Sequence, residues 1–275
     1  MTTPRQSGLR FPALLTVAAL AAACQQAVTP LPAVPGPTGT PSASSAAGPT
    51  PLATPARSAG LPQGSEPVTL DPADFVPTID NPYWPMSPGA RWVYRETDGE
   101  GAVFEVDITV TSDTKQILGI AATVVHDVVT EDGELVEDTL DWYAQDSSGN
   151  IWYLGEDTKE YEGGKVGSTA GSWEGGVDGA QPGIVVLARP EAGMTYRQEY
   201  YAGEAEDAAT VLSIDERVDV PFGTFEGVLL TKDYTPLDPA TLEYKFYSRG
   251  VGPVLVLAIA GGSGREELVT FEPGG

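Results

Sequence analysis

Cysteine and histidine are almost absent from this chain, which contains one of each, Cys24 and His126, in 275 residues. A single cysteine excludes an intrachain disulfide. Serine and cysteine hydrolases use a histidine base, and zinc sites need several histidine or cysteine ligands, so only His126 could serve in either. His126 lies in a strand-like run of apolar and β-branched residues, so we expect a surface or hydrogen-bonded side chain instead. The sequence therefore predicts no catalytic residue, no metal site and no cofactor.

Basic residues are also scarce: 15 lysines and arginines stand against 39 aspartates and glutamates, and the formal net charge is −24. A charge of this sign repels the phosphates of nucleic acids and anionic lipid headgroups, so we expect no nucleic-acid partner. The charge suits a soluble surface, or one that recruits cations. The simplest interpretation is that the acidic residues solvate the outer faces of strands.

Helical periodicity is missing as well, and the short acidic stretch from Glu204 to Ala209 is the nearest candidate. Instead, β-branched and aromatic segments follow one another between glycine- and proline-rich turns. Val103 to Thr111 alternates cleanly between apolar and polar residues, as a half-buried strand does. The expected strands are 91–95, 103–111, 120–129, 135–145, 151–155, 184–188, 195–201, 208–218, 227–234, 242–248, 251–259 and 266–271. Glycines cluster between 163 and 183 around Trp173, which predicts a long, flap-like loop containing one short strand.

Strands joined by hairpins, without helices between them, predict an all-β fold of antiparallel meander topology. A sheet of roughly a dozen strands must close or curl, because exposed edges promote aggregation. We therefore expect a strongly curved antiparallel meander sheet or an open barrel.

The stretch from Asp141 to Leu154 predicts a central β-hairpin, with aromatic residues in both arms and a polar loop between them. With a loop from Asp146 to Gly149, Tyr143 would face Trp152 and Trp142 would face Tyr153. Both faces of the hairpin then carry rings, and only one face can point into the core. The other pair is either covered by the preceding segment near Trp84, which is the simpler interpretation, or exposed on a concave surface. The candidate ligand-binding residues are therefore Trp142, Tyr143, Trp152 and Tyr153.

The N-terminal residues 1–23 have the features of a signal peptide, with Arg5 and Arg10 followed by a short apolar run. Small residues lead directly to Cys24, which resembles a relaxed bacterial lipobox. On that resemblance Cys24 is the lipidated N terminus of the mature protein, and its acyl chains attach the protein to the bacterial cell membrane. The alternative is a secreted soluble protein.

Residues 24–67 are nearly all proline, alanine, serine, threonine and glycine. Such a segment cannot bury enough apolar surface to fold, so we predict a disordered tether, whose serines and threonines can accept O-glycans. A single all-β domain is expected from residue 68 to 275. Its first part, up to Gly89, is rich in proline and irregular, with Tyr83 and Trp84 packing as a hydrophobic lid.

Two carboxylate-rich stretches are candidates for binding or catalytic sites. Asp146 to Asn150 places oxygen ligands at alternate positions, but Ile151 stands where a calcium loop needs glycine, so turn chemistry is the better explanation. The denser acidic run consists of Asp127, Glu131, Asp132, Glu134, Glu137, Asp138 and Asp141. Two of its carboxylates, if held in a cleft, could act as a glycosidase pair, whereas solvated strand faces are the simpler account.

Four segments resemble an uncharacterised bacterial family of secreted proteins and lipoproteins. They are Asp71-Pro-Ala-Asp-Phe75, Asn81 to Tyr94 (Asn-Pro-Tyr-Trp-Pro-Met-x-Pro-Gly-x-x-Trp-Val-Tyr), Asp141 to Asp157 (Asp-Trp-Tyr-Ala-Gln-Asp-x-x-Gly-Asn-Ile-Trp-Tyr-Leu-Gly-Glu-Asp) and Tyr247-x-x-Gly-Val-Gly252. The resemblance implies an extracytoplasmic location and brings no catalytic motif. The expected curved meander is also similar in shape to the LolA and LolB lipoprotein carriers, which implies fold and not function.

The sequence therefore favours a membrane-tethered, non-enzymatic binding or interaction lipoprotein, with a hydrophobic molecule or envelope component as its nominal ligand. A carboxylate-dependent hydrolase acting on envelope glycans and a purely structural surface protein are the alternatives. Facing carboxylates in a cleft, one of them desolvated, would favour the hydrolase.

Overall fold

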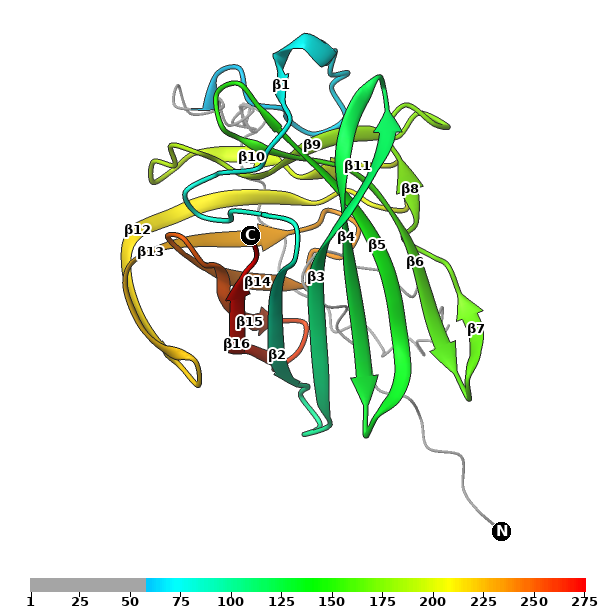
Figure 1. The fold of residues 1–275 in the computed structure, drawn as a ribbon, viewed down its shortest axis with the longest axis vertical. Helices are drawn as coiled ribbons and strands as arrows, with labels where there is room; N and C mark the ends of the chain where they lie inside the picture. Colours follow the sequence, from blue (N-terminus) through cyan, green and yellow to red (C-terminus); the bar gives the residue numbers. More distant parts are fainter. Residues whose placement is uncertain (1–57) are drawn as a thin grey trace, which may run out of the picture. The chain divides into compact units, whose positions relative to one another are not determined.

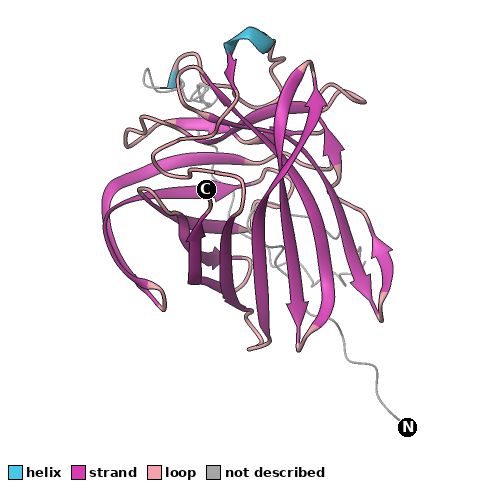
Figure 2. Cartoon of the chain, viewed as in Figure 1, coloured by secondary structure: helices cyan, strands magenta, loops and turns pink. Residues whose placement is uncertain are grey.

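The computed structural model describes residues 58–275, which form one antiparallel sheet of 16 strands. Figure 2 shows mostly strands and loops, and the short 3-10 helix Pro72–Asp74 lies ahead of the long strands, so the all-β prediction is confirmed. No helix of residues 58–275 has the length and apolarity to cross a membrane. The predictions of a leader over residues 1–23, of lipidation at Cys24 and of a tether up to residue 57 lie outside the described residues.

Most strands pair with the strand that precedes or follows them in the sequence. The strands are β1 (Phe75–Val76), β2 (Ala90–Thr97), β3 (Val103–Ile117), β4 (Ile120–Glu131), β5 (Glu134–Asp146), β6 (Ile151–Glu162), β7 (Lys165–Ser168) and β8 (Trp173–Glu174). They continue with β9 (Gln181–Val186), β10 (Thr195–Arg197), β11 (Glu199–Tyr200), β12 (Ala208–Val220), β13 (Gly223–Tyr234), β14 (Leu242–Ser248), β15 (Gly252–Ala260) and β16 (Arg265–Pro273). Most of these overlap the strands expected from the sequence, and several run longer.

The sheet curls until it is nearly closed. Its path runs β10-β12-β13-β14-β15-β16-β2-β3-β4-β5-β6-β9-β11, so the last strand of the chain, β16, pairs with β2 (Figure 1). The two ends of this path, β10 and β11, are consecutive in sequence. At that seam a side chain on Gly183 of β9 would collide with the backbone of Arg197 and Gln198, so glycine permits the close approach. The predicted curved meander or open barrel is confirmed.

Strand alternation decides which side chains enter the interior. Along β3, Phe104, Val106 and Ile108 are buried, while Glu105 between them is exposed. Val106 lies opposite Tyr94 of β2, which is also buried, so the inward face continues from β3 to β2. The alternation predicted for Val103 to Thr111 is therefore present.

The central hairpin has a different register from the expected one. The backbone amide of Asp146 bonds to the carbonyl of Asn150 at 3.0 Å, so the loop is shorter and shifted along the chain. Tyr143 consequently lies opposite Tyr153, and Trp142 lies opposite Gly155 after a bulge. The predicted pairs Tyr143–Trp152 and Trp142–Tyr153 are wrong, because the length of the loop sets the register from the turn to Tyr143, and the bulge between Trp142 and Tyr143 shifts it once more.

The proline-rich segment before β2 packs two aromatic side chains into the core. Tyr83 and Trp84 are buried, as predicted, and the Trp84 ring lies 5.5 Å from that of Tyr143 and 6.4 Å from that of Tyr247. Gly252 has φ +116°, and a side chain there would strike the Trp84 ring. This position therefore requires glycine.

Ordered contacts begin before residue 68, where we expected the domain to start. Ser58 accepts a hydrogen bond from the backbone amide of Thr195 at 2.8 Å through its hydroxyl oxygen. The Arg197 guanidinium donates to the carbonyls of Gly64 and Glu66, both at 2.8 Å. Residues 58–67 thus lie against the seam of the barrel and belong with the folded domain.

The glycine-rich segment between 163 and 183 is more regular than the long loop we expected. It contributes β7 and β8, both paired with β6, and the start of β9. Trp173, around which these glycines cluster, is buried and donates a hydrogen bond from its ring nitrogen to Glu199 at 2.8 Å.

Candidate functional site

Two of the four predicted aromatic residues lie together inside the barrel. The rings of Tyr143 and Tyr153 stack at 5.0 Å with an interplanar angle of 21°. Trp173 meets Tyr153 edge-on at 5.3 Å. These three rings form an aromatic wall, and they come from β5, β6 and β8.

The other two predicted residues face outwards and are covered. The Lys115 ammonium lies 3.2 Å from the centre of a Trp142 ring, and Phe75 packs against Trp152 at 6.3 Å. The preceding segment, which we expected to cover one pair of rings, covers Trp152 through Phe75. Trp142 is covered instead by Lys115 of β3, and Trp84 lies against Tyr143. Trp142 and Trp152 therefore cannot contact a ligand held inside the barrel.

Acidic side chains line the interior next to the aromatic wall. In the sheet register, Asp127 of β4 lies opposite Thr139 of β5, which lies opposite Thr158 of β6. Two residues further along these strands, Asp141 of β5 lies opposite Glu156 of β6. The buried carboxylic acids of the described residues include Glu96, Asp127, Glu137, Asp141, Glu156, Glu199, Asp233 and Glu266. The interpretation that the acidic run from Asp127 to Asp141 solvates outer faces is thus wrong for Asp127, Glu137 and Asp141.

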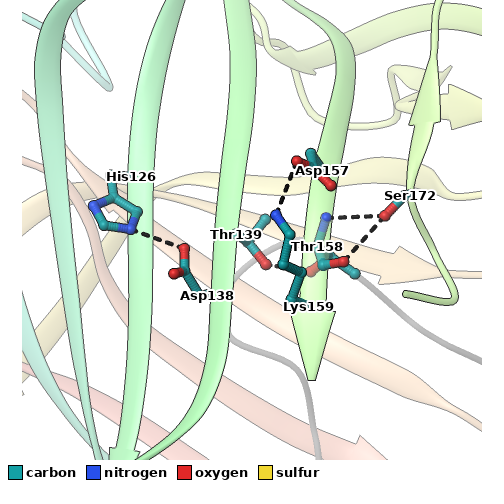
Figure 3. Close-up of polar contacts among 7 residues, drawn as sticks. All are labelled: His126, Asp138, Thr139, Asp157, Thr158, Lys159 and Ser172. Carbon is teal, nitrogen blue, oxygen red and sulfur yellow. Dashed lines mark hydrogen bonds and ion pairs between the residues drawn. The ribbon is translucent and has the colours of Figure 1, made fainter. Parts of the chain in front are cut away.

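The outer face of the same strands carries ordinary surface pairs. His126 contacts Asp138 at 3.0 Å and Lys159 contacts Asp157 at 2.9 Å, all four side chains being partly exposed (Figure 3). The prediction of a hydrogen-bonded surface histidine is confirmed. A groove of about 240 Å³ opens beside His126, but its Asp107 is already bound by Arg91.

Asp141 and Glu156 form a pair of like charges in the register of the sheet. Asp141 is 5 % exposed and Glu156 is 1 % exposed. Burial raises the pKa of Asp141 to about 7, against the effect of a 2.7 Å hydrogen bond from the Tyr153 hydroxyl. Burial also raises the pKa of Glu156, and the charges of Glu199 and Asp141 add to the effect, whereas the nearby Tyr153 hydroxyl, which donates its hydrogen bond to Asp141, opposes it. Placing both charges in this interior is therefore costly.

A second like-charge pair lies across the junction of the first long strand and the last. Glu96 of β2 is opposite Glu266 of β16. Burial raises the pKa of Glu96 to about 8, with further contributions from the charges of Glu243 and Glu137. Burial, followed by the charge of Glu96, raises the pKa of Glu266 as well. The acidic lining thus extends around the interior.

Several buried polar atoms of this lining meet no hydrogen-bond partner within residues 58–275. They are both carboxylate oxygens of Glu156, the Tyr143 hydroxyl, one oxygen of Asp127 and one oxygen of Glu266. Native proteins pair nearly all buried polar atoms, and exceptions call for an explanation such as a bound molecule. Glu156 and Tyr143 lie on neighbouring strands, so their atoms without hydrogen-bond partners belong to the same part of the interior.

The buried cations described in residues 58–275 are Lys245 and Arg197. Lys245 lies 3.4 Å from Asp233 and 3.7 Å from Glu243. Burial alone would lower the pKa of Lys245, but the charges of these carboxylates outweigh it and raise the pKa. Arg197 is directed to backbone carbonyls at the seam.

The described part of the chain, residues 58–275, contains no preformed metal site. Residues 58–275 contain no group of three or more histidine, cysteine, aspartate or glutamate side chains arranged to hold a metal ion. The interior carboxylates are distributed over several strands and do not converge on one point.

The sequence contained a signal for the acidic lining that we did not use. Asp127 stands two residues from both Val125 and Val129, and Asp141 stands two residues from Tyr143. Residues at this spacing share a face of a strand. An acidic residue that lies two positions from apolar residues of the buried face is on that face, and this spacing indicates a buried carboxyl group.

Comparisons with known proteins add little to this geometry. No protein-family model and no curated protein matches the chain. One solved structure, described as "a putative lipoprotein" from Parabacteroides distasonis, is similar with a TM-score of 0.39 and 12% identity, over 69% of this chain and 98% of that one. At this level of similarity we base no argument on it.

Proposed function

We propose that this protein is a non-enzymatic binding protein of the bacterial cell envelope, and that the inward-facing side chains of β4, β5 and β6 hold its ligand. The observation that carries this proposal is the set of buried polar atoms left without partners among the described residues, above all the Glu156 carboxylate and the Tyr143 hydroxyl. A ligand that supplied their hydrogen bonds would recover the cost of desolvating them.

The location follows from the N-terminal sequence. A leader over residues 1–23, a cysteine at its end and a tether before the domain support attachment to a membrane through Cys24. Replacing Cys24→Ala should release the protein from the membrane fraction of its host. Retention of the variant in that fraction would refute the lipid attachment.

The lining changes the kind of ligand that we expect. A purely hydrophobic molecule, our nominal candidate from the sequence, would leave Glu156 and Asp127 without hydrogen-bond partners in a dry interior. The aromatic wall of Tyr143, Tyr153 and Trp173 still offers apolar contact. A ligand with both an apolar part and hydrogen-bond donors fits this combination.

Native mass spectrometry of the full-length protein, purified in mild detergent from its own host, tests this proposal. We expect a small molecule to co-purify and to be lost from a Glu156→Gln variant. The matched control is Asp157→Asn, the next residue along β6, whose side chain faces outwards and pairs with Lys159. A ligand-free mass for the unsubstituted protein would favour a purely structural role.

The hydrolase alternative rests on one observation, the facing acids Asp141 and Glu156 with their raised pKa values. Their burial argues against it, because a glycan chain must reach both carboxyl groups. Release of reducing sugars from envelope glycans by the unsubstituted protein, abolished by Asp141→Asn, would establish this activity and overturn the non-enzymatic proposal.

A further inference from the structure

We propose that the ligand held in the barrel interior is a small organic ammonium ion, bound by the carboxylates of Asp141 and Glu156 beside the aromatic wall. This inference rests on the proposed binding function and names the chemical class of the ligand.

The first step is the charge imbalance around this pair. No lysine, arginine or histidine among residues 58–275 forms an ion pair with Asp127, Asp141 or Glu156. The buried cations of that range are engaged elsewhere: Lys245 contacts Asp233 and Glu243, and Arg197 bonds to backbone carbonyls. Buried carboxylates without a cation are expensive, and a cationic ligand supplies the missing charge.

The second step concerns hydrogen-bond chemistry. An ionised carboxylate only accepts hydrogen bonds, and both oxygens of Glu156 lack a donor among the described residues. An ammonium group carries several N–H donors, so it can bond to both carboxylates and to the Tyr143 hydroxyl oxygen at once. A neutral alcohol donates one hydrogen bond and leaves the charge uncompensated.

The third step distinguishes an organic cation from a metal ion. The described residues provide no converging set of metal ligands. They do provide aromatic surface next to the acids: Trp173 lies opposite Glu156 in the sheet register, and its ring meets Tyr153. Ammonium groups bind well where carboxylates and aromatic rings occur together, and the rings also cover the apolar part of the ligand.

Binding of an ammonium ion should be coupled to proton release. Both acids have raised pKa values because of burial, so the ligand must displace protons from the pair. The titratable groups that face this pair are Asp127 of β4, Glu137 and Tyr143 of β5, Tyr153 of β6 and Glu199 of β11. The charge of His126, on the outer face of β4, also acts on Asp141. Most of these groups are acids, which lose their protons as the pH rises. We therefore expect the affinity of the protein for the ammonium ion to increase between pH 6 and pH 8.5.

Isothermal titration calorimetry on the full-length protein in detergent, dialysed free of ligand, provides the test. The probes are phenethylamine and 1,6-diaminohexane, each compared with its matched alcohol, 2-phenylethanol and 1,6-hexanediol. We expect an amine to bind about 10- to 100-fold more tightly than its alcohol, as charge-assisted hydrogen bonds predict. Heats measured in two buffers of different ionisation enthalpy should show proton release.

Two variants make the site assignment falsifiable. Glu156→Gln should weaken amine binding at least about tenfold and reduce proton release, because it keeps the shape and removes the charge. Tyr143→Phe should weaken binding by a smaller factor. Asp138→Asn, on the outer face of β5, should bind the amines like the unsubstituted protein. Circular dichroism confirms that each variant is folded.

The outcomes separate this inference from the function on which it rests. Alcohols that bind as tightly as amines, or undiminished amine binding by Glu156→Gln, would overturn the cationic ligand. A neutral molecule that co-purifies with the protein would also overturn it while leaving the binding function intact. If no probe binds and nothing co-purifies, both proposals fall.

Discussion

Replacing Glu96→Gln should stabilise this protein at alkaline pH, although it removes a charged side chain. Glu96 lies in β2 directly opposite Glu266 of β16, and both are buried. Burial, followed by the charges of Glu243 and Glu137, raises the pKa of Glu96 to about 8. The folded protein therefore keeps a proton on Glu96 at a pH where the unfolded chain has lost it.

The sign and size of the effect follow from this difference. Between about pH 4.5 and pH 8 the folded state binds more protons than the unfolded state, so stability decreases as pH rises through this window. A pKa that rises from 4.5 to about 8 corresponds to a loss of about 5 kcal/mol once Glu96 is fully ionised. Water entry and relaxation around the charge reduce this, and we expect Glu96→Gln to recover about 2–4 kcal/mol at pH 9.

Urea unfolding at pH 5, 7 and 9, followed by circular dichroism, measures this effect. The free energy of unfolding of Glu96→Gln should exceed that of the unsubstituted protein most at pH 9 and differ little at pH 5. Glu105→Gln serves as the control, because Glu105 is a neighbouring strand residue with an exposed side chain. Equal stability of Glu96→Gln and the unsubstituted protein at pH 9 would refute the assigned burial and pKa.

Two further substitutions test the seam and the buried cation. Gly183→Ala should destabilise the protein by about 1–3 kcal/mol, because the added carbon meets the backbone of Arg197; unchanged urea unfolding would contradict the close approach of β9 and β10. Lys245→Met should cost about 3–5 kcal/mol at pH 8, since it leaves Asp233 buried without its ion pair. Thermal unfolding at pH 8 and pH 5 should show the loss shrinking at the lower pH, and a loss independent of pH would argue against an electrostatic cause.

The strands were predictable because their signals are local. The alternation of Val103 to Thr111 and the aromatic arms around Ser147 specify strands and turns without reference to the rest of the chain. The closure of the sheet also followed from general arguments about exposed edges. The pairing of β16 with β2 did not, because it joins segments far apart in sequence.

The register of the central hairpin could not be derived from its own sequence. Contacts from elsewhere select the shorter loop: the Ser147 amide bonds to the carbonyl of Asp74, and the side chain of Asn150 accepts from the amide of Ala188. Asp146 adds local bonds, accepting from the Trp152 ring nitrogen at 2.9 Å. These partners are invisible to a pattern of apolar and polar residues.

The interior acids were missed for a different reason. Alternation separates the two faces of a strand but does not say which face enters the core when both carry polar residues. On β5, Asp138 points outwards and Glu137 inwards, although the two are chemically alike. Unlike Asp127 and Asp141, Glu137 is placed by its neighbouring strand, because it lies opposite Val129 on the buried face of β4.

The position of Arg197 has a mechanical consequence. Its guanidinium ties the chain at Gly64 and Glu66 to Pro182 of β9, and the Arg197 backbone amide bonds to Pro62. A pull on the chain upstream of residue 58 would therefore reach this arginine before any long strand. Because these bonds join β10 to β9 across the seam, we expect force to separate the sheet at this junction before it disrupts the meander of β2 to β6.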